Sequence, residues 1–164
     1  MSKPQLQFVQ GDRLTFDWPV EIKWPESAKP GRTTTGRHTT KTCFVTFELV
    51  PDSELDDLQK ELQEYIDRIN TAAKKVRDAT DDEAKAEAKR EAEQAEADYK
   101  GWRLSLLRRV VVGLPDNHNW GSIFQDLPEF SSDLVEAMAD FRPIGVGLEQ
   151  AFWKLVNGGK TGNS

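Results

Sequence analysis

The sequence predicts an α+β fold, in which an N-terminal antiparallel β-hairpin or small sheet packs on a long helical hairpin and two C-terminal helices. Apolar residues alternate with polar ones up to residue 50, recur at spacings of three and four from 53 to 112, and then form short clusters between turn residues. A chain of 164 residues is the size of one domain. We therefore predict a single domain, 1–164, with a β part (1–50), a helical hairpin (51–112), C-terminal helices (113–157) and a disordered tail (158–164).

The composition argues against two classes of partner. The chain has 22 Lys+Arg and 28 Asp+Glu residues, which gives a net charge of -6. An acidic surface binds phosphate backbones and anionic lipids poorly, so we predict neither a nucleic-acid nor a membrane partner. No apolar run is long enough to cross a membrane, and the first residues lack an apolar signal segment. Together these features predict an intracellular location.

The first predicted strand runs from Leu14 to Trp24. Every even position in this run is apolar, whereas polar residues dominate the odd positions. A period of two places the apolar side chains on one face of a half-buried strand. Because Pro19 has no N–H to donate, the run is either an edge strand or two strands joined at a bulge.

A second strand is predicted from Cys43 to Val50, where alternate apolar residues again share one face. Residues 25–42 connect the two runs as a long polar loop with a cluster of basic side chains. Two interpretations of this loop stay open, an arm that grips a partner and a solvated flap. Its candidate partner-binding residues are Arg32 and Arg37.

Residues 53–112 are predicted to be helical. Apolar residues recur at spacings of three and four from Leu55 to Ala79, and alanine, aromatic and leucine residues do so again beyond residue 84. Ser53 has the side chain of an N-cap, and Thr-Asp-Asp-Glu at 80–83 has the spacing of a capping box. Two stripes with a restart predict an antiparallel helical hairpin, and a single long helix stays open. Because alanines bury little surface, the tip should be only marginally stable unless a partner covers it.

The last part is predicted to contain two helices. Turn residues from Gly113 to Asn119 end the preceding helix, and an irregular aromatic-rich stretch follows. Ser131 and Ser132 then provide an N-cap for a short helix. The final helix is predicted to stop at the Asn-Gly-Gly sequence of residues 157–159.

The residues that usually carry chemistry are scarce. The chain has one cysteine and two histidines, too few for a disulfide framework or a zinc site. Cys43 lies within a predicted strand, where a buried small hydrophobe is a better interpretation than a nucleophile. We therefore predict no catalytic residues, no metal, no cofactor and no enzymatic activity.

The order of these parts resembles the tail assembly chaperones of long-tailed bacteriophages. That family begins with β-patterned segments and a Phe-rich second strand, continues with an acidic Glu- and Leu-rich helix, and closes with a Gly/Trp turn, a Pro-Phe-Ser step and an aromatic last helix. The residues of this chain that match the pattern are Phe16, Val20, Ile22, Phe44, Phe47, Leu49, Leu55, Leu58, Trp120-Gly121, Leu127-Pro128-Glu129-Phe130-Ser131, Leu134, Leu148, Ala151, Phe152, Leu155 and Gly158-Gly159.

The resemblance implies a non-enzymatic role in the cytoplasm of an infected host cell. Proteins of that family bind the tape-measure protein and the tail-tube subunits during tail morphogenesis. The residues predicted to bind a partner are the loop arginines Arg32 and Arg37 and the helix-seam residues Leu62, Tyr65 and Ile69. The alternative function is a structural virion component, such as a minor tail or head–tail joining protein. The same apolar seam could pack within a hairpin or between two copies of the chain, so a homo-oligomer remains an open alternative.

Overall fold

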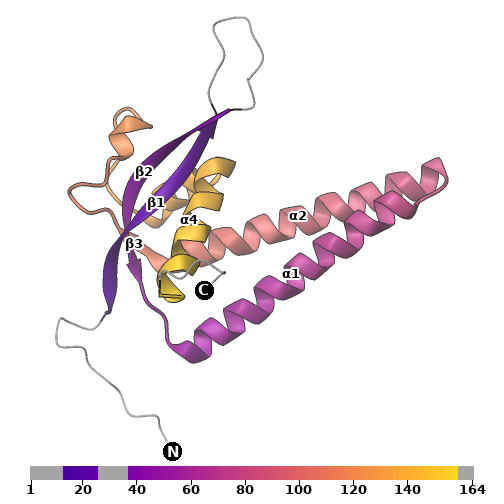
Figure 1. Cartoon of the computed structure of the whole chain (residues 1–164), viewed down its shortest axis with the longest axis horizontal. Coiled ribbons are helices and arrows are strands. Elements are labelled where there is room, and N and C mark those ends of the chain that lie inside the picture. Colours follow the sequence, from indigo (N-terminus) through magenta and orange to yellow (C-terminus); the bar gives the residue numbers. More distant parts are fainter. Residues whose placement is uncertain (1–12, 26–36, 159–164) are drawn as a thin grey trace, which may run out of the picture. The chain divides into compact units, whose positions relative to one another are not determined.

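A computed structural model describes residues 13–25 and 37–158 of the chain and confirms the α+β class (Figure 1). The single domain stays a prediction, and the described structure divides into two compact units. Unit 1 holds the residues up to Leu49 and from Leu106 onward, and unit 2 holds Val50–Ser105. The elements in chain order are β1 (Thr15–Pro25), β2 (His38–Glu48), α1 (Asp52–Asp78), α2 (Asp82–Val110), β3 (Val111–Gly113), the 3-10 turn η1 (Trp120–Ser122), α3 (Ser132–Ala139) and α4 (Arg142–Val156).

The two predicted strands form the centre of unit 1. β1 pairs with β2 in antiparallel register, with Val20 opposite Cys43. Both of these side chains are fully buried, as is Ile22, so the predicted alternation of buried and exposed positions is confirmed in the middle of β1. At its ends the same face is less covered, since Phe16 remains 41% exposed.

Pro19 fits the edge-strand interpretation of β1. The strand order in the sheet is β1-β2-β3, so β1 is an outer strand. Pro19 lies opposite Phe44, whose backbone N–H points away from β1 and donates to the carbonyl oxygen of His118 at 2.8 Å. At this position the two strands exchange no hydrogen bond, and the missing N–H of proline therefore leaves no ladder bond unmade.

The third strand corrects the predicted helix boundary at residue 112. We predicted helix up to that residue, but α2 ends at Val110 and Val111 begins β3. Val111 lies opposite Phe47, and Gly113 lies opposite Thr46. Valine is β-branched and fits a pleated strand well, so pairing with β2 overrides the helical pattern that precedes it.

The turn around η1 covers the remainder of the β2 edge. The Asn119 side-chain amide donates to the Thr42 carbonyl at 2.9 Å, and the Trp120 indole N–H donates to the Phe44 carbonyl at 2.9 Å. Asn119 has a left-handed backbone (φ 62°), which asparagine tolerates better than most residues. Trp120 is fully buried. The turn residues that the sequence assigned only to stopping a helix therefore also cap a sheet edge.

α4 packs against β1 at a position where only glycine fits. A Cβ atom built on Gly147 would lie 2.8 Å from the carbonyl oxygen of Glu21 and 3.5 Å from side-chain atoms of Val20 and Ile22. The helix therefore approaches the strand backbone more closely than any side chain allows.

Replacing Gly147 with alanine should lower the free energy of unfolding of the chain by about 1–3 kcal/mol, because the added methyl overlaps a backbone oxygen that cannot rotate away. Chemical denaturation monitored by tryptophan fluorescence measures this. Gly121→Ala is the matched control, since a Cβ there meets nothing within 4 Å. Equal losses in the two variants would contradict the close approach.

The predicted ends of the C-terminal helices are confirmed. The Ser131 hydroxyl accepts a hydrogen bond from the Leu134 N–H at 3.1 Å, which makes Ser131 the N-cap of α3. α4 ends at Val156, and Gly158 follows with φ +69°, the left-handed conformation that glycine adopts at helix ends. Of the predicted disordered tail, residues 159–164 lie outside the described residues.

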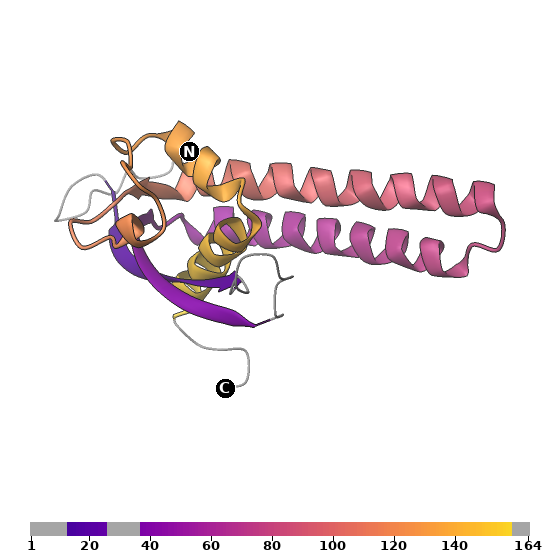
Figure 2. The same ribbon diagram turned by 90° about the horizontal axis from the view of Figure 1, so that it is seen from above.

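Unit 2 settles the choice between one helix and two. α1 and α2 are separate and run side by side (Figures 1 and 2). The Asp81 carboxylate accepts from the Ala84 N–H at 2.7 Å, so the N-cap lies within the 80–83 segment that the sequence indicated. The predicted cap at Ser53 is wrong, because α1 already begins at Asp52 and Pro51 occupies the cap position. Proline is accommodated there because the first turn of a helix has no partner for its N–H groups.

Candidate functional site

The seam of the helical hairpin contains few buried side chains. Within α1 and the part of α2 that belongs to unit 2, the buried residues are three alanines, Ala72, Ala88 and Ala95. The larger seam residues Leu62 and Ile69 are only half-buried. Contact between the helices therefore removes little apolar surface from water, as the alanine stripe predicted.

An aromatic cluster joins the two helices nearer their base. The Tyr65 ring lies 6.3 Å from the Tyr99 ring and 5.8 Å from the Trp102 ring, and the last two are stacked at 6.0 Å. The Trp102 indole N–H donates to the Glu61 carboxylate at 2.7 Å. Arg103 lies over the Tyr99 ring at 5.0 Å from its centre, a cation–π geometry. All three rings are half-buried, so the cluster both ties the hairpin together and presents part of its area to solvent.

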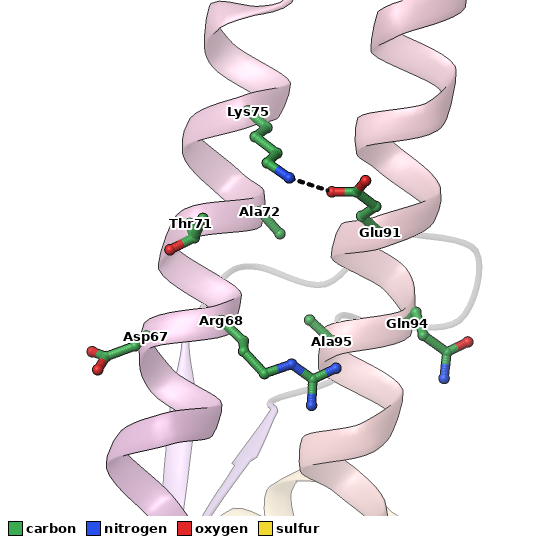
Figure 3. A pocket seen from close by; sticks show the side chains of 8 residues that line it. All are labelled: Asp67, Arg68, Thr71, Ala72, Lys75, Glu91, Gln94 and Ala95. Carbon is green, nitrogen blue, oxygen red and sulfur yellow. Dashed lines mark hydrogen bonds and ion pairs between the residues drawn. The ribbon is translucent and has the colours of Figure 1, made fainter.

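Beyond the aromatic cluster the hairpin opens into a groove of about 460 Å³ (Figure 3). Ala72 and Ala95 point into the space between the helices, and the Lys75–Glu91 ion pair spans it at 3.0 Å. A second groove of about 520 Å³ continues toward the tip, where Ala79, Ala84 and Ala88 are part of its lining. The outer half of the hairpin thus has small apolar residues flanked by charged side chains.

The Arg68–Asp98 ion pair crosses the seam between the aromatic cluster and the groove. Its closest nitrogen–oxygen distance is 2.7 Å. Hydrogen bonds from Arg68 and from Gln94 hold the pKa of Asp98 below its usual value. This carboxylate therefore stays ionised down to a lower pH than an isolated aspartate does.

The predicted partner-binding residues fall into two groups. Leu62, Tyr65 and Ile69 lie on α1 in unit 2, where Tyr65 contacts α2. Arg37 is exposed immediately before β2 in unit 1, and Arg32 lies outside the described residues. Partner binding by these five residues stays a prediction. Tyr99 and Trp102 were not included, although their place in the second apolar stripe could have indicated them.

The predicted boundary between the basic loop and the second strand is wrong, because β2 begins at His38 rather than at Cys43 and therefore includes Lys41. Lys41 donates to the Ser122 carbonyl at 3.1 Å, and its ammonium lies 5.9 Å from the centre of the Trp24 ring. His38, at the start of β2, is exposed. Lys41, one member of the predicted basic cluster, thus contacts both the η1 turn and a tryptophan of β1.

Cys43 is a buried side chain of the sheet, which confirms its structural interpretation. Burial raises the pKa of its thiol above the usual value, and Ser122 and Lys41 offset this only in part. Within residues 13–25 and 37–158, no group of three or more His, Cys, Asp or Glu side chains could hold a metal ion.

We expect Cys43 to react far more slowly with dithiobis-nitrobenzoate in the folded chain than in denaturant. The thiolate is the reactive form, and both burial and the raised pKa reduce its amount and its access. Absorbance at neutral pH, with and without guanidinium, measures the two rates. Rapid and complete labelling of the folded protein would contradict this placement of the thiol.

None of the described helices is both long enough and apolar enough to pass through a lipid bilayer. Comparison of the chain with known protein families, with curated proteins and with solved structures finds no match.

Proposed function

We propose that this chain is a non-enzymatic tail assembly chaperone of a long-tailed phage. It binds the tape-measure protein, the tail-tube subunits or both in the host cytoplasm. The observation that carries the proposal is the helical hairpin, whose outer half has an alanine seam and two charge-flanked grooves. The resemblance of the sequence to that family gives the identity of the partners.

The energetics of the hairpin favour a covering partner. Burying a leucine side chain contributes about 1.5–3 kcal/mol, and a single methylene about 0.8 kcal/mol. With Ala72, Ala88 and Ala95 as its buried residues, the hairpin gains little from its own interface. A second protein that covers the half-exposed seam adds the missing burial, so binding and ordering of the hairpin are coupled.

The side chains at half-buried positions also suit protein recognition. Residues that dominate binding energy at protein interfaces are enriched in tryptophan, tyrosine and arginine. The base of the hairpin brings Tyr65, Tyr99, Trp102 and Arg103 together in one cluster. Part of the area of this cluster is open to solvent, which makes it an anchor for an apolar segment of a client.

Co-expression tests the proposal directly. The tape-measure protein of the same phage should be more soluble when it is made together with this chain. In the complex, the backbone amides of residues 66–95 of this chain should exchange hydrogen more slowly than in the free chain. Purified virions should lack the chain. A tape-measure protein that stays insoluble contradicts the proposal, and a chain that persists in the particle supports the structural virion component instead.

The loop arginines have a separate test. Replacing Arg32 and Arg37 with glutamate should weaken tape-measure pull-down without lowering the melting temperature. The double variant Lys23→Glu/Arg142→Glu makes the same charge change at exposed positions of unit 1, outside the helical hairpin that is proposed to bind the partner. Equal effects of the two double variants would remove the loop from the binding surface.

A further inference from the structure

Unit 1 contains a groove in which three arginines converge from two distant segments. Its volume is about 530 Å³. Arg13 comes from the residues before β1, and Arg108 and Arg109 come from the last turn of α2. The lining residues are Arg13, Glu48, Arg108, Arg109, Val111, Val112, Phe130 and Ser132.

The arginines of this groove are held in place but keep much of their surface open to water. Glu48 lies between two of them, 3.7 Å from Arg13 and 3.6 Å from Arg109, both beyond hydrogen-bond distance. Arg108 forms an ion pair with Glu136 and another with Asp133 at 3.6 Å. The exposed fractions of the side chains are 67% for Arg13, 40% for Arg108 and 44% for Arg109, against 17% for Glu48.

We propose that this groove, called here the arginine groove, binds an acidic peptide segment of a partner protein. Arginine presents a planar fork of donors that matches a carboxylate, and several such forks lie around one hollow. Val112 and Phe130 supply apolar lining, so a segment with an apolar side chain next to its carboxylates complements the groove in both respects.

The charges around the groove favour a peptide over a nucleic acid. The Glu48 carboxylate lies inside it, and Asp133 and Glu136 lie beside Arg108. A strand with a phosphate at every nucleotide would meet these carboxylates as well as the arginines, and like charges repel. A carboxylate on a flexible peptide can instead pair with single guanidinium groups and avoid the acidic residues.

The arginine groove deepens the proposed function, because it names the chemistry of one partner segment. The proposal for the groove depends on the proposed function in one respect only, namely that the partner is a protein. A test with synthetic probes needs no phage protein, so its failure is distinguishable from failure of the co-expression experiment.

The probe is a fluorescein-labelled peptide of alternating pairs of glutamate and leucine, with fluorescence anisotropy as the measurement. We expect it to bind the full chain, and to bind more weakly as salt is added. The same peptide with lysine for glutamate, and single-stranded DNA of equal length, should bind much less. The variant Arg13→Glu/Arg109→Glu should weaken binding of the acidic peptide by about tenfold or more, since it removes two charge-assisted contacts. The control variant Arg77→Glu/Arg90→Glu makes the same charge change in unit 2 and should not weaken binding of the acidic peptide.

A second variant separates binding from a merely structural ion pair. Glu48→Gln removes the carboxylate that competes for Arg13 and Arg109, so it should tighten binding of the acidic peptide severalfold. If the ion pairs serve only stability, Glu48→Gln lowers the melting temperature and leaves the affinity unchanged, which overturns the proposal. DNA that binds as tightly as the peptide overturns it too. A third outcome also overturns it: the chain does not bind the peptide but self-associates, and Arg13→Glu/Arg109→Glu abolishes the self-association. The groove would then bind a second copy of the chain.

Discussion

Phe152→Ala should lower the free energy of unfolding by about 3–5 kcal/mol, one of the two largest losses that we expect from a single substitution in this chain. Phe152 is fully buried on α4, with its ring 6.0 Å from that of Phe47 in β2 and 5.2 Å from that of Trp153. Substitution by alanine removes the ring from between the helix and the sheet. The cavity that remains is costly because the surrounding side chains can fill it only in part. Since domains are typically stable by about 5–15 kcal/mol, this variant loses a large share of its stability.

Phe141→Ala is the matched control for this prediction. It makes the same chemical change at the N-cap of α4, but Phe141 is 53% exposed and contacts the ring of Phe124 at 6.0 Å. We expect it to cost less than about 1 kcal/mol, as is usual for surface positions. Guanidinium titration of both variants gives the comparison. Similar losses would mean that α4 does not pack on the sheet through Phe152.

The sequence predicted those elements whose signals are local. The period of two in β1 and the spacing of three and four in the hairpin depend only on neighbouring residues, and both are confirmed. Ser131 and Gly158 were recognised because a cap or a left-handed glycine acts within one turn of its helix. The hairpin also followed from the restart at residues 80–83.

Features that depend on pairing between distant segments could not be predicted. β3 is too short to show a period of its own, and Val111 is a strand residue only because β2 lies beside it. The η1 turn covers the β2 edge through Asn119 and Trp120, which are 76 or more residues away from their acceptors. For the candidate site, the sequence indicated Tyr65 but not the arginine groove, because Arg13 and Arg109 meet only in the folded unit.

Trp120 should be the other most sensitive position, because it combines burial with a long-range hydrogen bond. Its side chain is fully buried, and its indole N–H holds the η1 turn to β2 through the Phe44 carbonyl. Trp120→Ala should therefore cost about 3–5 kcal/mol of unfolding free energy. Trp120→Phe keeps most of the ring but leaves that carbonyl without its indole donor, so we expect a loss of about 1–3 kcal/mol.

Trp153 provides the comparison that isolates the hydrogen bond. Its indole N–H is buried and finds no acceptor among the described residues. Trp153→Phe removes an unpaired donor, and removing an unpaired buried polar group offsets part of the lost packing. It should cost less than Trp120→Phe in the same denaturation experiment.

The reactivity of Cys43 gives an independent measure of the same contact. Its sulfur lies 3.6 Å from the Asn119 carbonyl, directly under the turn that Trp120 holds in place. If Trp120→Phe loosens that turn, labelling of Cys43 by dithiobis-nitrobenzoate should be faster in this variant, at denaturant concentrations where the chain is still folded. Trp153→Phe should leave the rate unchanged. Equal labelling in both variants would show that the indole hydrogen bond does not hold the turn on β2, and that Trp120 contributes to stability through burial alone.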